Sequence, residues 1–381
     1  MKLAVVAPIE ETVPPTTYGG IEWIVHEIVS AMAKKGHQVT LFAAGDSKTG
    51  NAVRLIPTVE KSIRTIPEIA QDPLLRDVTK FITYEQTVEY IQKGDFDLVH
   101  NHAGWRFLLY SRFINTPIVT TLHGPLNPPY QQLVFDTFRH TRYISISNNQ
   151  RKGMPSLPYV ATVYNGVDLT NYSFSETNLP ERTAPMMFLA RFSPEKGGVE
   201  AATVATRLNK KLLIAAKVDA VDQRYFRSAQ DVVRNNYIQF IGEIDLSRKA
   251  ELLASARCLI APIQWEEPFG LMFIEALAAG TPVVAYSRGA APEIIKDGKT
   301  GYLVNQSAQF HRGNFTIDKT GIDGLAEAIE RIYSLSDTDY QTMRKECRAH
   351  VVQHFTASSM VNAYEHAYRK VLAEKPHFVD K

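Results

Sequence analysis

The sequence predicts an α/β protein built from two doubly wound domains, each a mostly parallel sheet covered by helices on both faces. Short, continuously apolar strands alternate with helical patterns in the first half, which is typical of buried parallel sheets. The same alternation starts afresh after the polar stretch DLTNYSFSETNLPERTAP. A chain of 381 residues with 45% hydrophobic side chains is also long enough for two cores of ordinary size.

The first domain is predicted over residues 1–170. A strand at 3–8 precedes a helix at 21–36, in which Ile24, Ile28 and Met32 share one apolar face and Gly36 ends the pattern. Further strands are predicted at 38–44, 96–102, 116–124, 143–147 and 159–168.

The second domain is predicted over residues 171–355. Its strands are expected at 186–191, 211–216, 237–242, 258–263, 282–286 and 301–304, with helical segments between them. A last helical pattern over about 356–373 forms a third segment, 356–381, which could cross back to the N-terminal domain.

The amino-acid composition indicates which kinds of partner the protein binds and in which cellular compartment it is expected. Lysine and arginine total 42 against 40 acids, and the N-terminal half alone is balanced, so nucleic acid is not an expected partner. The only cysteines, Cys258 and Cys347, have no metal-ligand spacing and fit a reducing, cytoplasmic location. No apolar stretch approaches the roughly 20 residues of a membrane span, so any membrane contact is expected to be peripheral.

Ligands of open α/β sheets bind beyond the carboxyl ends of the strands, so the residues that follow each strand are candidates for a site. In ARFSPEKGG, Arg191 and Lys196 follow a strand and precede a helix beginning near Gly197. Two cations at a helix N-terminus favour a diphosphate, because helix dipole and free amides add to the charge-assisted bonds. The alternative is a solvated loop with ordinary surface charges.

Two carboxylates flank a Pro-Phe-Gly turn in WEEPFGLMFIEALAAG, Glu267 before the turn and Glu275 within an apolar helix. A carboxylate in such a helix costs energy unless it is bonded, and a ribose diol would supply two donors. Amides of Phe269, Gly270 and Leu271 could meet sugar hydroxyls or phosphate. One alternative pairs Glu275 with an internal Arg or Lys. Another makes the two acids a glycosidase pair, which leaves Arg191 and Lys196 without a role.

Other candidates lie in the first domain. Gly19 and Gly20 stand at a loop-to-helix junction, where backbone amides could approach a ligand or simply form a tight turn. His100, His102 and His123 lie at strand ends without an acidic ligand at useful spacing, so we expect no metal. The acidic pair Asp95 and Asp97 precedes its strand and lies at the wrong end for such a site. The aromatic side chains of Tyr18, Trp23, Trp105 and Tyr130 could pack on a sugar or belong to the core.

Taken together, these segments resemble the retaining glycosyltransferases of family 4, which have the GT-B fold of two Rossmann-like domains facing a central cleft. The resemblance rests on Glu-x7-Glu in EPFGLMFIEALAAGTPVVA, on ARFSPEKG before it and on GAAPEIIKDGKTGYLV after it. It also covers YGGIEWIVHEIVSAMAKKGHQVTLFA, DLVHNH and NGVD, hence nearly the whole chain.

The resemblance implies roles for the candidate residues. Arg191 and Lys196 would hold the donor diphosphate, Glu275 the ribose, and Glu267 with the amides of 269–271 the donor sugar. His123 would lie near the transferred sugar, and Gly19 and Gly20 would approach the phosphates or the acceptor. Many relatives carry a glycine pair where this chain has IAAKVDAVD, so this segment departs from the family pattern for nucleotide contacts.

The reaction that the resemblance implies is transfer of a hexose from a UDP- or GDP-linked sugar to a hydroxyl, with retained anomeric configuration. It needs no metal and no cofactor, and the acceptor would be a small molecule, a saccharide or a lipid. The alternatives are a sugar-nucleotide epimerase of the same fold and a non-catalytic protein that binds a nucleotide sugar.

Overall fold

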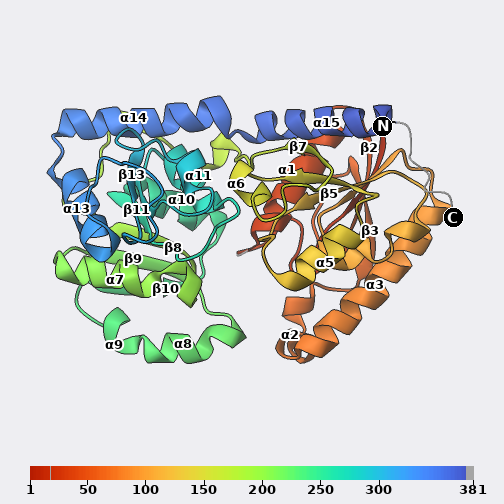
Figure 1. Ribbon diagram of the computed structural model, residues 1–381, viewed down its shortest axis with the longest axis horizontal. Helices are drawn as coiled ribbons and strands as arrows, with labels where there is room; N and C mark the ends of the chain where they lie inside the picture. Colours follow the sequence, from red (N-terminus) through yellow and green to blue (C-terminus); the bar gives the residue numbers. More distant parts are fainter. Residues whose placement is uncertain (18, 375–381) are drawn as a thin grey trace. The chain divides into compact units, whose positions relative to one another are not determined.

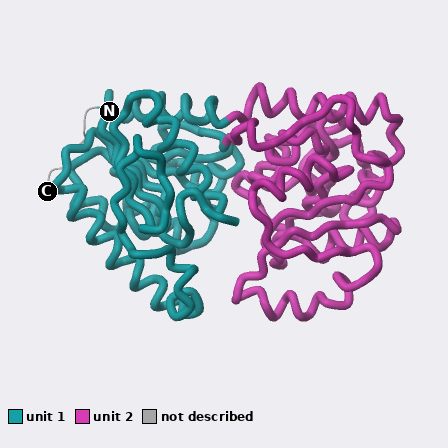
Figure 2. The backbone as a smooth tube through the Cα atoms, turned by 180° about the vertical axis from the view of Figure 1, so that it is seen from behind, with its two compact units in different colours: residues 1–165, 357–381 teal, residues 166–356 magenta. Residues whose placement is uncertain are grey.

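The computed structural model describes residues 1–17 and 19–374, which form two compact units (Figure 2). Unit 1 combines residues 1–165 with the C-terminal segment that begins at Ala357, and unit 2 contains Gly166–Thr356. The division thus falls between Asn165 and Gly166, a few residues before the boundary expected at 170.

Unit 1 contains a seven-stranded sheet in the order β3-β2-β1-β4-β5-β6-β7, and every strand pair in it is parallel. The strands are β1 Lys2–Val6, β2 Gln38–Ala44, β3 Val53–Val59, β4 Leu98–Asn101, β5 Ile118–Leu122, β6 Arg142–Ser145 and β7 Tyr159–Thr162. Val6 at the end of β1 pairs with Asn101 at the end of β4, so the residues after both strands emerge at one edge.

The two faces of this sheet are covered by different helices (Figure 1). Helices α1 (Gly20–Lys34) and α15 (Ala357–Ala373) pack against each other on one face, although they come from opposite ends of the chain. On the other face, α3 (Pro73–Lys93) and α4 (Trp105–Leu108) bury Tyr84, Val88 and Phe107 against β1 and β4. The remaining elements are α2 Pro67–Gln71, α5 Pro129–Thr137, α6 Asn148–Arg151 and the 3-10 turns η1 Ile63–Thr65 and η2 Ser111–Phe113.

Unit 2 contains a six-stranded parallel sheet in the order β10-β9-β8-β11-β12-β13. Its strands are β8 Met186–Arg191, β9 Leu212–Lys217, β10 Ile238–Gly242, β11 Cys258–Ala261, β12 Val283–Tyr286 and β13 Gly301–Val304. Strands β8 and β11 are adjacent at the centre of the sheet. The two candidate motifs, ARFSPEKGG and WEEPFGLMFIEALAAG, follow these two strands.

Helices also cover both faces of the second sheet. Helices α7 (Gly198–Arg207) and α13 (Gly321–Ser334) pack together on one face, while α10 (Leu246–Ser255), α11 (Leu271–Ala278) and α14 (Asp337–His354) pack in sequence on the other. The shorter elements are α8 Gln223–Ser228, α9 Gln230–Val233, α12 Ala291–Ile294, η3 Leu169–Asn171, η4 Pro194–Lys196 and η5 Ala220–Asp222. The predicted fold class, two doubly wound α/β domains, is confirmed; the cleft expected between the domains stays a prediction.

One strand was not predicted from the sequence. Strand β3 contains Pro57 and is only partly buried, so it lacks the continuous apolar pattern used to find the others. It lies at the edge of the sheet, where a proline can be accommodated because one side of the strand makes no ladder bonds.

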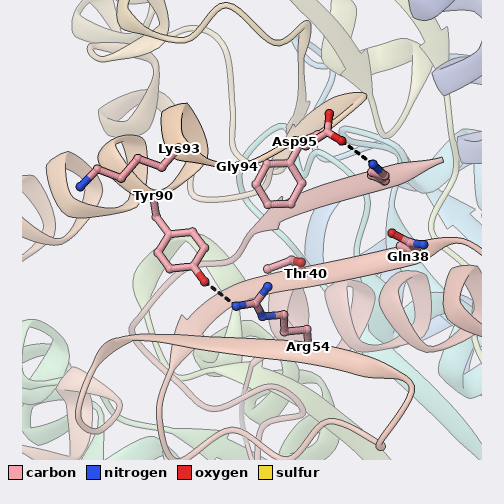
Figure 3. A pocket seen from close by; sticks show the side chains of 9 residues that line it. Gln38, Thr40, Arg54, Tyr90, Lys93, Gly94 and Asp95 are labelled. Carbon is pink, nitrogen blue, oxygen red and sulfur yellow. Dashed lines mark hydrogen bonds and ion pairs between the residues drawn. The ribbon is translucent and has the colours of Figure 1, made fainter.

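A hollow of about 440 Å³ lies at the amino-terminal edge of the unit 1 sheet (Figure 3). It is lined by Lys2, Gln38 and Asp95, which begin or precede β1, β2 and β4, and Arg54 closes one side through a hydrogen bond to Tyr90. Asp95 pairs with Lys2, and Asp97 accepts a hydrogen bond from the amide of Lys2, so both acids lie at the end of the sheet expected from the sequence. This hollow is therefore at the edge opposite the candidate residues of unit 1.

Candidate active site

The first candidate motif forms a tight connection from β8 to α7. Arg191 is the last residue of β8, Lys196 lies in the turn η4, and Gly197 caps α7 in a left-handed conformation with φ 78°. A Cβ atom on Gly197 would lie 2.0 Å from the carbonyl oxygen of Pro262, so only glycine lets this loop pack on the end of β11. The amide of Gln264 donates to the carbonyl of Glu195 at 2.8 Å and joins the two motifs.

Lys196 and Glu267 form an ion pair between the two motifs. The Lys196 Nζ lies 2.5 Å from Glu267 Oε2, and both side chains are only 12% exposed. Trp265 donates its indole N–H to the same carboxylate oxygen at 2.9 Å, and its ring centroid lies 5.0 Å from the ammonium. The pair is therefore held in one geometry, with little solvent to screen it.

Glu275 is buried in α11 and has two partners from distant parts of unit 2. Lys249 of α10 pairs with Glu275 Oε1 at 2.5 Å, and the Tyr172 hydroxyl donates to that oxygen at 3.0 Å. The alternative that pairs Glu275 with an internal cation is thus observed, with Lys249 as the cation. Neither Lys249 nor Tyr172 was singled out in the sequence, because each is recognisable only once α10 and η3 are placed beside α11.

The predicted Pro-Phe-Gly turn leads directly into α11. Gly270 caps the helix with φ 87°, and Leu271 is its first residue. The first amides of a helix lack intrahelical acceptors, so the start of α11 presents donors beside the Glu267 carboxylate.

Arg191 lies among three acidic side chains. Its guanidinium pairs with Glu195 at 2.6 Å, Asp222 at 3.4 Å and Asp219 at 3.5 Å. Burial raises the pKa of Asp222, and Arg191 opposes this rise. Asp219 and Asp222 belong to IAAKVDAVD, the segment that departs from the family pattern, and the structure shows that it supplies counter-ions to Arg191.

Glu266, next to Glu267, was also not predicted as a site residue. It accepts from the Gly289 amide at 3.0 Å and pairs with Arg288 at 3.2 Å and Arg312 at 2.8 Å. Burial tends to raise the pKa of Glu266, but the Gly289 amide and the two guanidinium groups lower it overall. Arg312 belongs to the loop after β13, to which the sequence assigned no purpose. Its guanidinium bonds Glu266 and its amide donates to Asn305 Oδ1, so this loop packs against the segment before α11.

The unit 1 candidates follow β1, β4 and β5. Gly19 caps α1, and a Cβ atom there would lie 2.6 Å from Pro15. His123 follows β5, and desolvation lowers the pKa of its imidazole to about 3, so it is neutral at physiological pH. Tyr18 lies outside the described residues, and the rings of Trp105 and Tyr130 contact each other edge to face at 5.9 Å.

In unit 2, Arg191 ends β8, Lys196 and Glu267 form an ion pair in the loops after the adjacent strands β8 and β11, and Glu275 lies within α11. In unit 1, Gly19 and Gly20 lie at the start of α1, and His123 follows β5. Throughout residues 1–17 and 19–374, no three His, Cys, Asp or Glu side chains are grouped so that they could hold a metal ion. In the same residues, no helix has both the length and the apolar character that a membrane crossing requires.

Comparison with known families identifies both units. The model described as Glycosyl transferases group 1 matches residues 171–348, and the model described as Glycosyltransferase Family 4 matches residues 18–171. The chain is a glycosyltransferase that combines a family 4 domain with a group 1 domain. The predicted glycosyltransferase family and enzyme class are confirmed, and retention of the anomeric configuration stays a prediction.

Known relatives of this glycosyltransferase span nearly its whole length. It is 27% identical to a phosphatidyl-myo-inositol mannosyltransferase of Mycolicibacterium smegmatis, over 90% of this chain and 93% of that protein. It is 24% identical to the N-acetyl-alpha-D-glucosaminyl L-malate synthase of Bacillus anthracis, over 93% of this chain and 95% of that protein.

Solved structures share the fold of this glycosyltransferase. A sucrose-phosphate synthase from Thermosynechococcus elongatus has a TM-score of 0.77 at 20% identity, covering 98% of this chain and 99% of that one. AviGT4, a glycosyltransferase of avilamycin A biosynthesis, has a TM-score of 0.69 at 22% identity with the same coverage. Anabaena HepE, solved with UDP-glucose, has a TM-score of 0.72 at 16% identity, covering 97% of this chain and all of that one.

Proposed function

We propose that this glycosyltransferase moves a hexose from a UDP- or GDP-linked sugar to an acceptor hydroxyl, with retained anomeric configuration and without a metal ion. The observation that carries the proposal is the presence in unit 2 of two lysine–glutamate pairs, one directly before α11 and one within it, in addition to Arg191 at the end of β8. In each pair, Lys196–Glu267 and Lys249–Glu275, a cation is in contact with a carboxylate. A nucleotide sugar combines an anionic diphosphate with hydroxyl groups, and this mixture of groups can bind both.

Lys196 and Arg191 would bind the diphosphate. As the bond to the sugar breaks, negative charge grows on the departing diphosphate, and fixed cations stabilise that charge without rearranging. Each cation is now paired with acids, Lys196 with Glu267 and Arg191 chiefly with Glu195. Donor binding would replace part of these pairings, so the acids hold the cations in position before the ligand arrives.

Glu267 and Glu275 would then bind the two sugars of the donor. Once the diphosphate shares Lys196, the Glu267 carboxylate can accept hydrogen bonds from hydroxyls of the transferred hexose, beside the amides of 269–271. Glu275 would accept from the ribose diol, with Lys249 and Tyr172 fixing the orientation of its carboxylate. Lys249 also supplies the counter-charge that a buried carboxylate requires.

Unit 1 would bind the acceptor, and His123 would contact the transferred sugar. A neutral imidazole can donate through one nitrogen and accept through the other, which suits hydroxyl ligands. The backbone at Gly19 and Gly20 would approach the phosphates or the acceptor. Transfer requires that both substrates be bound at once.

The relatives support the choice of reaction in general terms. The mycobacterial and Bacillus relatives are named as a mannosyltransferase and a glucosaminyl L-malate synthase, and HepE is solved with UDP-glucose. These names favour a nucleotide sugar as donor and a lipid or small hydroxyl compound as acceptor. Membership of a transferase family also favours transfer over the epimerase and sensor alternatives.

The proposal is tested by measuring release of nucleoside diphosphate from a panel of UDP- and GDP-sugars, with sets of saccharide, lipid and small-molecule acceptors, in the presence of EDTA. We expect release that depends on the acceptor and is unaffected by EDTA, and NMR coupling constants of the product that show the anomeric configuration of the donor. Interconversion of the donor sugar without release would support the epimerase instead, and an inverted product would overturn retention.

A further inference from the structure

Three histidines at the carboxyl edge of the unit 1 sheet form a hydrogen-bonded row, the histidine chain: His123, His102 and His100. His102 Nδ1 lies 2.8 Å from His123 Nε2, and His102 Nε2 lies 3.1 Å from His100 Nδ1. The His102 ring stacks on that of His123, with centroids 5.1 Å apart. His100 and His102 are fully buried, whereas His123 is only partly buried, so the histidine chain runs from the interior of unit 1 to the candidate site residue His123.

His100, the innermost residue of the histidine chain, is hydrogen-bonded to the C-terminal helix α15. The Tyr368 hydroxyl of α15 lies 2.7 Å from His100 Nδ1, and His100 Nε2 lies 2.8 Å from Thr121 Oγ1. Tyr368 is fully buried, and His100 is its hydrogen-bond partner. If this hydroxyl accepted a bond instead of donating one, its own proton would be left without an acceptor in the interior, which is unfavourable.

A donating Tyr368 determines the tautomer of every ring in the chain. His100 Nδ1 must then be the acceptor, so its proton is on Nε2 and points to Thr121. His102 Nε2 lies 3.1 Å from the same His100 Nδ1, and an unprotonated Nε2 there would set two lone pairs against each other. His102 therefore carries its proton on Nε2 and shares the Nδ1 lone pair as a second, longer donor, so that its own Nδ1 accepts from His123. His123 is left with its proton on Nε2 and with Nδ1 as the ring atom that can accept a bond.

We propose that His102, His100 and Tyr368 are positioning residues that fix His123 as the Nε2-protonated tautomer, with Nδ1 ready to accept a hydrogen bond from a substrate hydroxyl. The effect on transfer rests on the proposed function, whereas the tautomer itself does not. Burial and the mutual repulsion of protonated rings keep the pKa values of His100 and His102 well below the usual range, so the chain stays neutral and ordered. The C-terminal helix α15 would thereby act on His123 through the Tyr368–His100 contact.

The experiment compares the full-length wild type with Tyr368→Phe. Long-range ¹H–¹⁵N NMR spectra of histidine-labelled protein show which ring nitrogen carries the proton, and single His→Gln variants assign the signals. We expect His123 protonated at Nε2 in the wild type and a mixture of both tautomers in Tyr368→Phe. In the same variant kcat should fall about tenfold with little change in KM, by analogy with residues that orient metal-bound histidines.

Tyr364→Phe is the matched control. Tyr364 lies one helical turn earlier on α15 and is as deeply buried. Its ring also packs on His100, with centroids 5.3 Å apart, but its hydroxyl is bonded to Thr121 at 3.4 Å, so that Tyr364→Phe keeps the ring packing and removes only that bond. It should keep the wild-type tautomer of His123 and the wild-type kcat. If Tyr368→Phe does not fold, His102→Gln should produce the same mixture of tautomers.

The outcomes separate the two proposals. A wild-type His123 protonated at Nδ1, or tautomers unchanged in Tyr368→Phe and His102→Gln, would overturn the positioning role even in an active transferase. An Nε2-protonated His123 in a protein that transfers no sugar would instead support the tautomer assignment and count against the proposed function.

Discussion

Removing the Lys196 ammonium should lower both catalytic turnover and stability. In Lys196→Ala, the diphosphate loses a cation that is only 12% exposed, and we expect kcat to fall about a hundredfold, or roughly 2.7 kcal/mol of transition-state stabilisation. The Glu267 carboxylate would keep the Trp265 indole as a donor but lose its counter-ion. Breaking a buried pair in this way costs about 3–5 kcal/mol at most, so the variant should also melt at a lower temperature.

The double variant Lys196→Ala/Glu267→Gln distinguishes the two effects. Replacing the carboxylate by a neutral amide removes the unpaired charge, so most of the lost unfolding free energy should return while turnover stays low. Donor turnover and urea unfolding are measured for wild type, both single variants and the double variant. Arg207→Ala, which removes a half-exposed cation of α7 that pairs with Asp323, is the control for net charge and should stay close to wild type. Turnover of Lys196→Ala within about threefold of wild type would refute the assignment of Lys196 to the leaving group.

Three further predictions follow from buried groups. Glu275→Ala should weaken donor binding about tenfold in calorimetry by removing the acceptor for the ribose, and an unchanged affinity would remove Glu275 from the site. Burial raises the pKa of Glu22 from 4.5 to about 8 in the native state. Between pH 4.5 and pH 8 the native state therefore holds a proton that the unfolded chain has lost. As the pH rises through this range, the free energy of unfolding should fall by up to about 1.4 kcal/mol per pH unit. Urea unfolding of Glu22→Gln should lack this part of the pH dependence, and a slope equal to that of the wild type would contradict the argument. Gly197→Ala should destabilise unit 2 by several kcal/mol more than Gly242→Ala. Both glycines have positive φ, but only Gly197 lacks room for a Cβ atom. Equal melting temperatures of the two variants would contradict the tight packing of Gly197 on Pro262.

The parallel sheets could be predicted from the sequence because their inner strands are continuously apolar. All strands of unit 2 lie within or close to the predicted ranges, whereas β3 of unit 1 was missed because Pro57 and its exposed positions break the pattern. The C-terminal helix was predicted, but its position against α1 could not be, since an apolar face does not say which surface it covers.

The candidate site could be predicted only in part, for a related reason. Local motifs pointed to Arg191, Lys196, Glu267 and Glu275, because a strand end followed by a helix start is visible in a short segment. Their partners could not be seen in this way. Tyr172 and Lys249 reach Glu275 from other elements, and Tyr368 reaches His100 from the far end of the chain, so no local spacing connects them.

The central claim is that unit 2 binds the nucleoside diphosphate of the donor through its two lysine–glutamate pairs. It is tested by measuring the melting temperature of the protein with a panel of nucleotide sugars. A bound ligand stabilises the native state by about 2.7 kcal/mol at a hundred times its dissociation constant. We predict that a UDP- or GDP-sugar raises the melting temperature of the wild type and that this shift is lost in the double variant Lys196→Ala/Glu275→Ala. A shift of equal size in that variant, or no shift with any UDP- or GDP-sugar at millimolar concentration, would contradict the account.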